Sequence, residues 1–179
     1  MPPADAVEAA AAARGPEETL ADHVVRLALV KARAVAATMA AATILACDTL
    51  SEVDGEALGK PRDRADARRM LQRLSGRTHR VLTGVCLWDH PGFPPETTAV
   101  ESILTMPPLD ATFIEGYLDT GLWQGKAGAC GFQDGHVPLQ LVTGSSSNVV
   151  GLPLEAVGEM LERLDERRRA SDRRRTHGG

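Results

Sequence analysis

Residues 43–49 read Thr-Ile-Leu-Ala-Cys-Asp-Thr, a largely apolar run over residues 43–47 that is followed by Asp48 and Thr49. A short run of β-branched and apolar residues predicts a buried strand of an α/β sheet. Asp48 would then follow the strand's last residue, and we expect its carboxylate at the carboxyl edge of the sheet, where open α/β folds bind their ligands. A lone Asp in this position is also typical of a turn or a helix cap.

The segments around this run alternate between helical and extended patterns. Apolar residues at helical spacing predict helices over residues 18–42, 63–74, 110–119 and 153–168. Asp63 has the position and the chemistry of an N-cap for the second of them. Extended runs predict further strands over residues 80–88, 97–104 and 136–142, and residues 145–147 read as a polar loop. The pattern indicates one α/β catalytic domain over residues 18–168.

The two ends of the chain differ from this central region. Residues 1–17 are rich in alanine, contain Pro2, Pro3 and Pro16, and show no apolar period, so we expect a flexible arm. Residues 169–179 are rich in arginine, and such a charged end most often forms a disordered, solvated tail.

Composition excludes several classes of protein. The net charge is −4 and the chain has two Trp, one Tyr and three Phe, which argues against stable nucleic-acid binding. Cys47, Cys86 and Cys130 are widely spaced and show no CxxC pattern, as expected for reduced thiols in the cytoplasm. We find no apolar stretch long enough to span a membrane and no signal-peptide pattern at the start.

Lysine is rare among the cations of this chain. Of the 20 Lys and Arg residues only Lys31, Lys60 and Lys126 are lysines. Lys60 follows a glycine, and Lys126 lies within a cluster of glycines (121, 125, 128, 131 and 135), where the backbone is expected to approach another group closely. A compact ammonium suits a point contact to a phosphate oxygen, so an anionic ligand is one interpretation and chance is the other.

Residues 75–79, Ser-Gly-Arg-Thr-His, connect a predicted helix to a strand. Ser75 and Arg77 are candidate phosphate-binding residues there, although the segment is equally typical of a plain helix end. His79 has no partner evident from the sequence, and the chain lacks a catalytic triad, an HExxH pair and a GxxxxGK[ST] loop. Since the histidines are scattered, any cation is expected to be a hard one, held by carboxylate and phosphate oxygens.

Six short motifs occur in order along the chain. They are LALVKA (27–32), ACDT (46–49), LGKP (58–61), LSGRTH (74–79) with TGV (83–85), KAGACGFQ (126–133) and SNVVGLPL (147–154). In this order they resemble the motifs of the Maf family of nucleoside triphosphate pyrophosphatases, over about residues 18 to 160. Six ordered motifs are far more specific than any single glycine pattern.

The resemblance implies a two-lobed α/β fold of the Maf/ITPase-like type, with a long central mixed sheet flanked by helices, commonly as a homodimer. It also implies hydrolysis of a nucleoside triphosphate to the monophosphate and pyrophosphate with a divalent cation, Mg²⁺ or Mn²⁺. Asp48 matches the family's proton acceptor and is the expected metal ligand. Lys31, Lys60 and Lys126 match cations around the triphosphate, and Thr49 and Gln133 match the branch that prefers dTTP and UTP.

The chain departs from the family pattern in three places, of which the mildest is Cys130 and Phe132 where Tyr and Ile are typical. Family members begin with an apolar strand that leads into Ser-x-Ser-Pro-Arg-Arg, whose serine and arginines bind phosphate. In this chain no serine precedes Ser51, and Arg14 is the single arginine of residues 1–17. We therefore expect this phosphate-binding segment to be missing. Residues 122–125, Leu-Trp-Gln-Gly, replace the usual Glu-Pro and Asp before the lysine. Two alternatives to an active enzyme therefore stay open: a nucleotide-binding or regulatory homologue without turnover, and a fragment that folds poorly.

Overall fold

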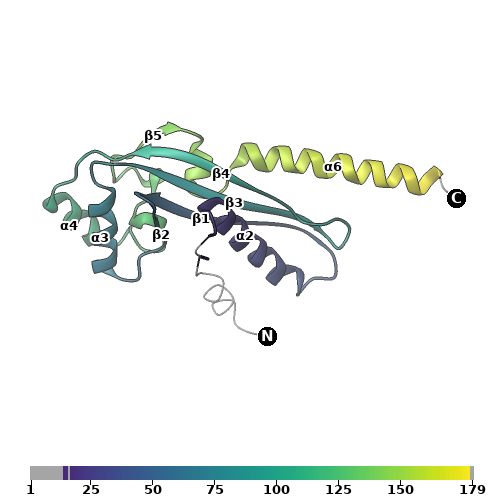
Figure 1. Ribbon diagram of the computed structural model, residues 1–179, viewed down its shortest axis with the longest axis horizontal. Coiled ribbons are helices and arrows are strands. Elements are labelled where there is room, and N and C mark those ends of the chain that lie inside the picture. The colour runs from purple at the N-terminus through teal and green to yellow at the C-terminus, as the bar shows by residue number, and fades with distance from the viewer. Residues whose placement is uncertain (1–13, 16, 178–179) are drawn as a thin grey trace.

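The computed structural model describes residues 14–15 and 17–177, so most of the segment expected to form a flexible arm lies outside the described residues. Within the described part, five strands form one sheet in the order β2-β1-β3-β4-β5 (Figure 1). The strands are β1 (Ala42–Val53), β2 (Glu56–Leu58), β3 (Thr78–His90), β4 (Glu96–Thr105) and β5 (Gln140–Thr143). The α/β class, with helices flanking a long sheet, is confirmed.

Two expectations about the sheet need correction. Every pairing among the described strands is antiparallel, whereas a mixed sheet was expected. Asp48 does not follow the end of its strand, because β1 continues to Val53 and pairs Asp48 with Gly84 of β3. The polar residues Ser51 and Glu52 hide this continuation in the sequence, yet both are buried.

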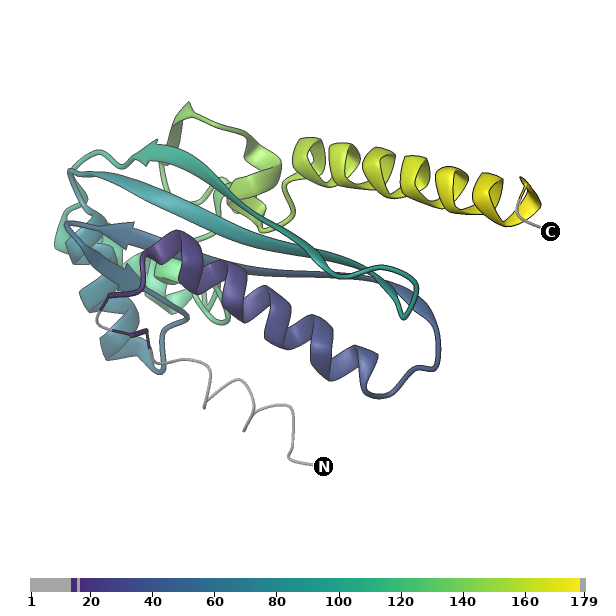
Figure 2. The ribbon, with the colours of Figure 1, turned by 45° about the vertical axis from the view of Figure 1, so that its right-hand side comes forward.

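The helix α2 (Leu20–Ala36) covers one face of β1 and β3 (Figure 2). The side chain of Thr19 caps it by accepting a hydrogen bond from the backbone N–H of Asp22 at 3.1 Å. Gly84 of β3 lies beneath it, where a Cβ atom would overlap the backbone of Val24. Glycine at this position therefore sets how closely the helix approaches the sheet.

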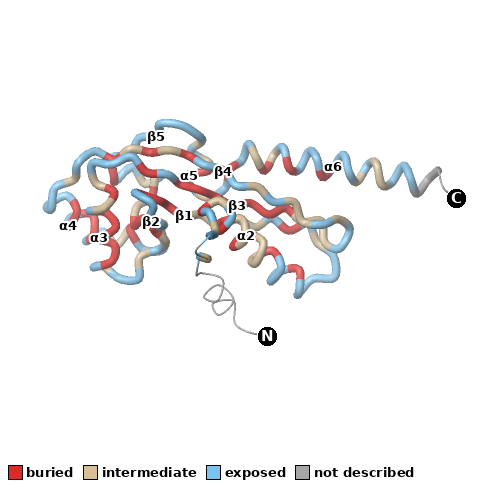
Figure 3. Tube along the Cα trace, viewed as in Figure 1, coloured by how far each residue is buried: buried red, intermediate tan, exposed pale blue. Residues whose placement is uncertain are grey.

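The opposite face of the sheet carries α5 (Ser146–Val150) and the first turns of α6 (Leu154–His177). Val85 and Leu87 of β3 pack against Val157, Met160 and Leu164 of α6. Beyond Leu164 none of its described residues up to position 174 is buried (Figure 3). Arg167 and Arg168 still pair with Glu96 of β4 and Asp89 of β3. Residues 169–177, expected to be a disordered tail, thus continue the helix.

A second group of elements packs at the end of the sheet where β1 finishes. It contains α3 (Arg64–Leu74), α4 (Ala111–Asp119) and the short 3-10 turns η1 (Ala127–Ala129) and η2 (Phe132–Asp134) (Figure 1). Their shared core includes Leu71, Leu74 and Leu118. The expected helices at 63–74 and 110–119 are confirmed within a residue, and Asp63 caps α3 as expected.

Other boundaries differ more. The first helix ends at Ala36 rather than residue 42, and the strand expected over 136–142 is limited to Gln140–Thr143. The expected polar loop at 145–147 instead begins α5, because the Ser145 side chain caps that helix. No helix in the described part of the chain is both long and apolar enough to span a membrane.

Candidate active site

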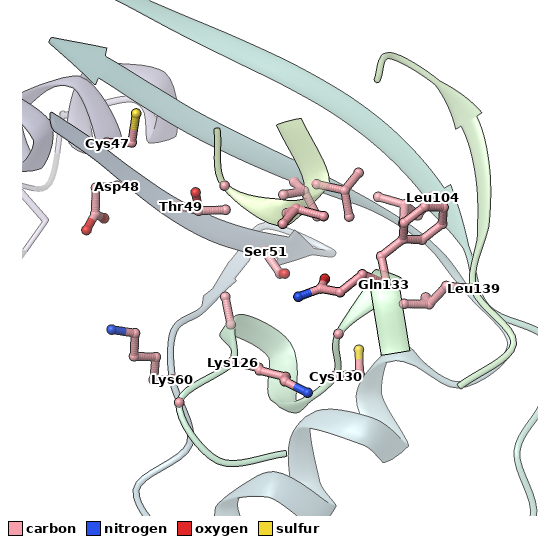
Figure 4. Close-up of a pocket in the computed structure, with 18 of the residues that line it drawn as sticks. Cys47, Asp48, Thr49, Ser51, Lys60, Leu104, Lys126, Cys130, Gln133 and Leu139 are labelled. Carbon is pink, nitrogen blue, oxygen red and sulfur yellow. The ribbon is translucent and has the colours of Figure 1, made fainter. Parts of the chain in front are cut away.

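A cavity of about 380 Å³ opens between the sheet and the turns η1 and η2 (Figure 4). It lies along the part of β1 that β2 leaves uncovered, since β2 pairs only with Ser51–Val53. Asp48 and Lys60 line one end of the cavity, and Gln133, Leu104 and Leu139 line the other. The cavity thus has a charged end and a largely apolar end.

At the charged end, Lys31 of α2 and Asp48 of β1 form an ion pair. The Lys31 ammonium Nζ donates to Asp48 Oδ1 at 2.5 Å, and it lies 3.5 Å from the carbonyl oxygen of Cys47. The Asp48 side chain is 14% exposed and the Lys31 side chain 36%. The contact holds the Asp48 carboxylate in one orientation at the cavity wall.

Lys60 reaches the same end from the segment that follows β2 (Figure 4). The carbonyl of Gly59 accepts a hydrogen bond from the backbone N–H of Gly128 at 3.0 Å, which anchors this segment to η1. Among the residues that the structure describes, Lys60 has no carboxylate within ion-pair distance, so its charge is available to an anionic ligand.

Lys126 lines the cavity and forms an ion pair with Asp134. The pair crosses over Gly131, where a Cβ atom would collide with the Asp134 carboxylate. Gly128, with φ +67°, lies against the Ser51 side chain. At these two positions the close backbone approach expected from the glycine cluster is confirmed.

A second cavity of about 350 Å³ lies on the α2 side of β1 and shares Asp48, Thr49 and Lys60 with the first. Successive side chains of a strand point to opposite faces, so Asp48 faces α2 while Thr49 faces α5. Arg14 also lines this second cavity. The uncovered edge of β1 therefore has polar groups on both sides.

Behind Thr49 lies a buried hydrogen-bond network. The hydroxyls of Thr49 and Thr83 lie 2.9 Å apart, and Thr83 Oγ1 donates to the carbonyl of Asn148 at 3.2 Å. The Asn148 amide in turn donates to Ser102 Oγ at 2.8 Å. Gly151, at φ +106°, places its Cα beside Thr49. The network connects α5 to the strands that carry the site.

At the apolar end, Gln133 lies near Leu104 and Leu139 (Figure 4). His79 also lines the cavity but is only 3% exposed, and burial lowers the pKa of its imidazole below the ordinary value. The ring is therefore neutral near pH 7.

The thiols near the cavity are not activated. Burial raises the pKa of the Cys130 thiol to about 12 and raises that of Cys47 as well. Both side chains are free cysteines, as is Cys86. Because the thiolate is the nucleophilic form, covalent catalysis by either cavity thiol is disfavoured.

The structure brings together most of the residues singled out in the sequence, and leaves out two. Asp48, Thr49, Gln133 and the three lysines all line the first cavity. Ser75 and Arg77 line neither cavity. Ser75 Oγ accepts a hydrogen bond from the Leu109 backbone at 2.7 Å, and Arg77 pairs with Asp54. Their role is to join elements, as in a plain helix end.

Four residues of the site escaped sequence reasoning: Ser51, His79, Asp134 and Asn148. Ser51 and His79 line the cavity, Asp134 holds Lys126, and Asn148 supports Thr49 through Thr83. His79 and Asn148 lie within two of the six ordered motifs, whereas Ser51 and Asp134 carry no signal in the sequence.

The geometry defines an α/β protein in which an aspartate and three lysines line one cavity. The family model described as "Maf-like protein" matches residues 2–164. The chain belongs to the Maf family, which confirms the resemblance seen in the motifs.

Relatives of known name agree with this assignment. The dTTP/UTP pyrophosphatase of Rhodopirellula baltica is 41% identical over 167 residues, covering 93% of this chain and 72% of the relative. The dTTP/UTP pyrophosphatases of Symbiobacterium thermophilum and Moorella thermoacetica are each 46% identical over 142 residues. Those alignments cover 79% of this chain and 72% and 73% of the relatives.

Proposed function

We propose that this protein hydrolyses dTTP, UTP or modified nucleoside triphosphates to the monophosphate and pyrophosphate. The observation that carries the proposal is a single cavity in which Asp48, Lys31 and Lys60 line one end and Gln133 lines the other, with Lys126 between them (Figure 4). Its size is within the range of small-molecule sites. The names of the relatives support the same reaction and substrates.

In the proposed reaction, Asp48 accepts a proton from the attacking water. The water oxygen bonds to the α-phosphorus, the bond between that phosphorus and the α–β bridging oxygen breaks, and pyrophosphate leaves with the bridging oxygen. Lys31 positions the Asp48 carboxylate through its 2.5 Å contact. Lys60 and Lys126 neutralise phosphate oxygens, which is the main contribution that a protein makes to phosphoryl transfer.

The donor atoms of the cavity fit Mg²⁺ or Mn²⁺. The described residues contain no cluster of three or more His, Cys, Asp or Glu side chains that could hold a metal unaided. Asp48 provides a hard oxygen ligand, and Mg²⁺ commonly uses one or two carboxylates together with substrate phosphates. When bound, the ion would polarise the phosphates and withdraw charge from the leaving group.

Pyrophosphate release from dTTP, UTP and CTP with Mg²⁺ tests the proposal, with Asp48→Asn as the variant. We expect release by the wild type with a preference for dTTP and UTP, and a loss of about 100-fold or more in kcat for Asp48→Asn, since a general base commonly contributes that much. Wild-type release that equals that of Asp48→Asn would contradict it.

A nucleotide-binding or regulatory module is the second candidate. It is favoured by one observation: Lys31 and Lys126 both contact carboxylates, so part of the cationic charge is already compensated. Measurable affinity for UTP without pyrophosphate release would select this candidate.

The same proposal includes the oligomeric state and the location of the protein. We propose a homodimer in the cytoplasm that does not bind nucleic acid stably. Large exposed apolar side chains concentrate between residues 142 and 161, namely Val142, Val150, Leu152, Leu154 and Leu161, which supports self-association. The net charge of −4 argues against nucleic-acid binding. Light scattering at several protein concentrations measures the oligomeric state.

A further inference from the structure

The apolar end of the cavity contains a polar group whose hydrogen-bonding capacity is incomplete. His79 is 3% exposed, and its ring nitrogen Nδ1 is buried without a hydrogen-bond partner, although the Arg77 backbone lies close enough to the ring to oppose the lowering of its pKa by burial. Leaving such an atom unpaired costs about 1–3 kcal/mol, so native proteins retain few of them. This cost requires an explanation, since an apolar side chain in the same place would avoid it.

The register of the sheet fixes which surface His79 belongs to. His79 of β3 is paired directly with Leu104 of β4, and side chains of directly opposed residues lie on the same face of a sheet. Val81 follows on the same face, and both Val81 and Leu104 line the cavity. His79 is therefore set beside the apolar residues Leu104 and Val81, five residues along β3 from Gly84, the partner of Asp48.

This placement separates the two parts of a nucleotide. The phosphates require cations, and Lys31 and Lys60 provide them at the charged end, whereas the flat and largely apolar base suits the other end. A base seated there meets the His79 imidazole and the Gln133 amide as polar groups among Leu104, Leu139 and Val81. We infer that His79 is a base-recognition residue that, together with Gln133, hydrogen-bonds the edge of uracil or thymine. The inference rests on the proposed function and adds a specificity residue to it.

The donor and acceptor pattern explains the choice of base. A neutral imidazole provides one donor and one acceptor, and an amide side chain provides both. Uracil and thymine present a carbonyl acceptor at C4 and an N–H donor at N3. Cytosine presents an amino donor at C4 and an acceptor at N3, the reverse arrangement. A site arranged for one edge leaves its buried groups unpaired with the other, which is the strongest source of discrimination between similar substrates.

Binding of analogues that cannot be cleaved tests the inference without turnover. The dissociation constants of α,β-methylene-UTP and α,β-methylene-CTP with Mg²⁺ are measured by calorimetry for the wild type, His79→Leu and His79→Gln. For His79→Leu we expect the UTP analogue to bind about tenfold more weakly and the CTP analogue to change less than about threefold, as for loss of one buried hydrogen bond. His79→Gln, which keeps a donor and an acceptor, is expected to restore most of the difference.

His79 has a matched control on its own strand. His90 of β3 also has a buried Nδ1 without a partner, yet it lines neither cavity. His90→Leu is expected to leave the affinities for both analogues unchanged. An equal loss for both analogues in His79→Leu, an unchanged affinity for the UTP analogue, or no binding of either analogue to the wild type would overturn the inference.

A second measurement covers the case in which His79→Leu does not fold. The imidazole ¹⁵N signals of the wild-type protein are followed during titration with α,β-methylene-UTP and, separately, with inorganic triphosphate, with the His79 signals assigned from His79→Gln. We expect the His79 signals to shift with the nucleotide and not with triphosphate, and equal responses would overturn the inference. A wild type that prefers the UTP analogue but releases no pyrophosphate from UTP would refute the proposed function while supporting the role of His79.

Discussion

The ammonium of Lys31 on α2 lies 2.5 Å from Oδ1 of Asp48 on β1, and this ion pair lies at the charged end of the cavity. The two residues are brought together because α2 packs across β1 and β3, where Gly84 allows close approach. Lys31 is more than a third exposed, so solvent screening limits what the pair adds to stability. Its consequence is the orientation of the carboxylate.

Replacing Lys31 should therefore affect turnover more than binding. For Lys31→Met we expect kcat with UTP to fall by about 100-fold while KM changes by less than about threefold, since a misoriented base impairs the transition state and leaves phosphate contacts in place. Lys31→Arg keeps the charge and should recover part of kcat. Steady-state kinetics measure both constants. A rise in KM with kcat intact would instead identify Lys31 as a phosphate-binding residue.

The ion pair between Lys126 and Asp134 predicts an effect on KM rather than on kcat. Incoming phosphates must compete with the Asp134 carboxylate for the Lys126 ammonium. For Asp134→Asn we expect KM for the triphosphate to fall about threefold to tenfold at low ionic strength, with a smaller effect at high salt because screening weakens the competition. Asp119→Asn is the matched control, since it removes the same charge at an exposed residue that pairs with Arg64. Equal effects of the two variants would contradict a local role for Asp134.

The sequence was sufficient to predict the helices and strands that depend on local periodicity and capping. The N-cap Asp63, the helices at 64–74 and 111–119, and the strands around residues 80–88 and 97–104 follow from periodicity and capping alone. The strand that the sequence predicts before Asp48 is too short, because Ser51 and Glu52 look like loop residues although tertiary packing buries both. Ordered motifs identified the lysines, Asp48 and Gln133 as site residues, and they share one cavity.

What could not be predicted depends on contacts between residues far apart in sequence. Asn148 reaches the site only through Thr83, and the environment of His79 depends on strand register with Leu104. Ser75 and Arg77 illustrate the converse, because polar residues at a helix end look alike whether they bind phosphate or hold Leu109 and Asp54. Local sequence determines the chemical properties of a residue and its local secondary structure, whereas strand register and packing determine which residues it contacts.

Acid should weaken the contact between α3 and α4. Arg68 and Arg64 lower the pKa of Glu115 on α4 to about 2 from its ordinary value of 4.5. A lowered folded-state pKa means that the contribution to stability is complete above pH 4.5 and is lost as the pH falls toward 2. Glu115→Gln should therefore lower the urea midpoint at pH 6.5 and have a progressively smaller effect from pH 5 to pH 3. A cost independent of pH would show that packing, rather than charge, is responsible.

The buried hydroxyl of Thr83 is expected to be the most sensitive part of the network behind Thr49. Thr83 is fully buried, and its Oγ1 contacts both Thr49 Oγ1 at 2.9 Å and the Asn148 carbonyl at 3.2 Å. Thr83→Val has nearly the same shape but removes both contacts and leaves the Thr49 hydroxyl without this hydrogen-bond partner, whereas the Asn148 carbonyl still accepts from the Gly151 backbone N–H at 2.9 Å. We expect a loss of about 1–3 kcal/mol in the free energy of unfolding, measured by urea denaturation. Thr97→Val, at an exposed position of β4, is the control and should change stability by less than about 0.5 kcal/mol. Because Thr49 lines the cavity, Thr83→Val should also raise KM for UTP. If the variant loses stability but keeps its kinetic constants, the network supports the fold without positioning the site.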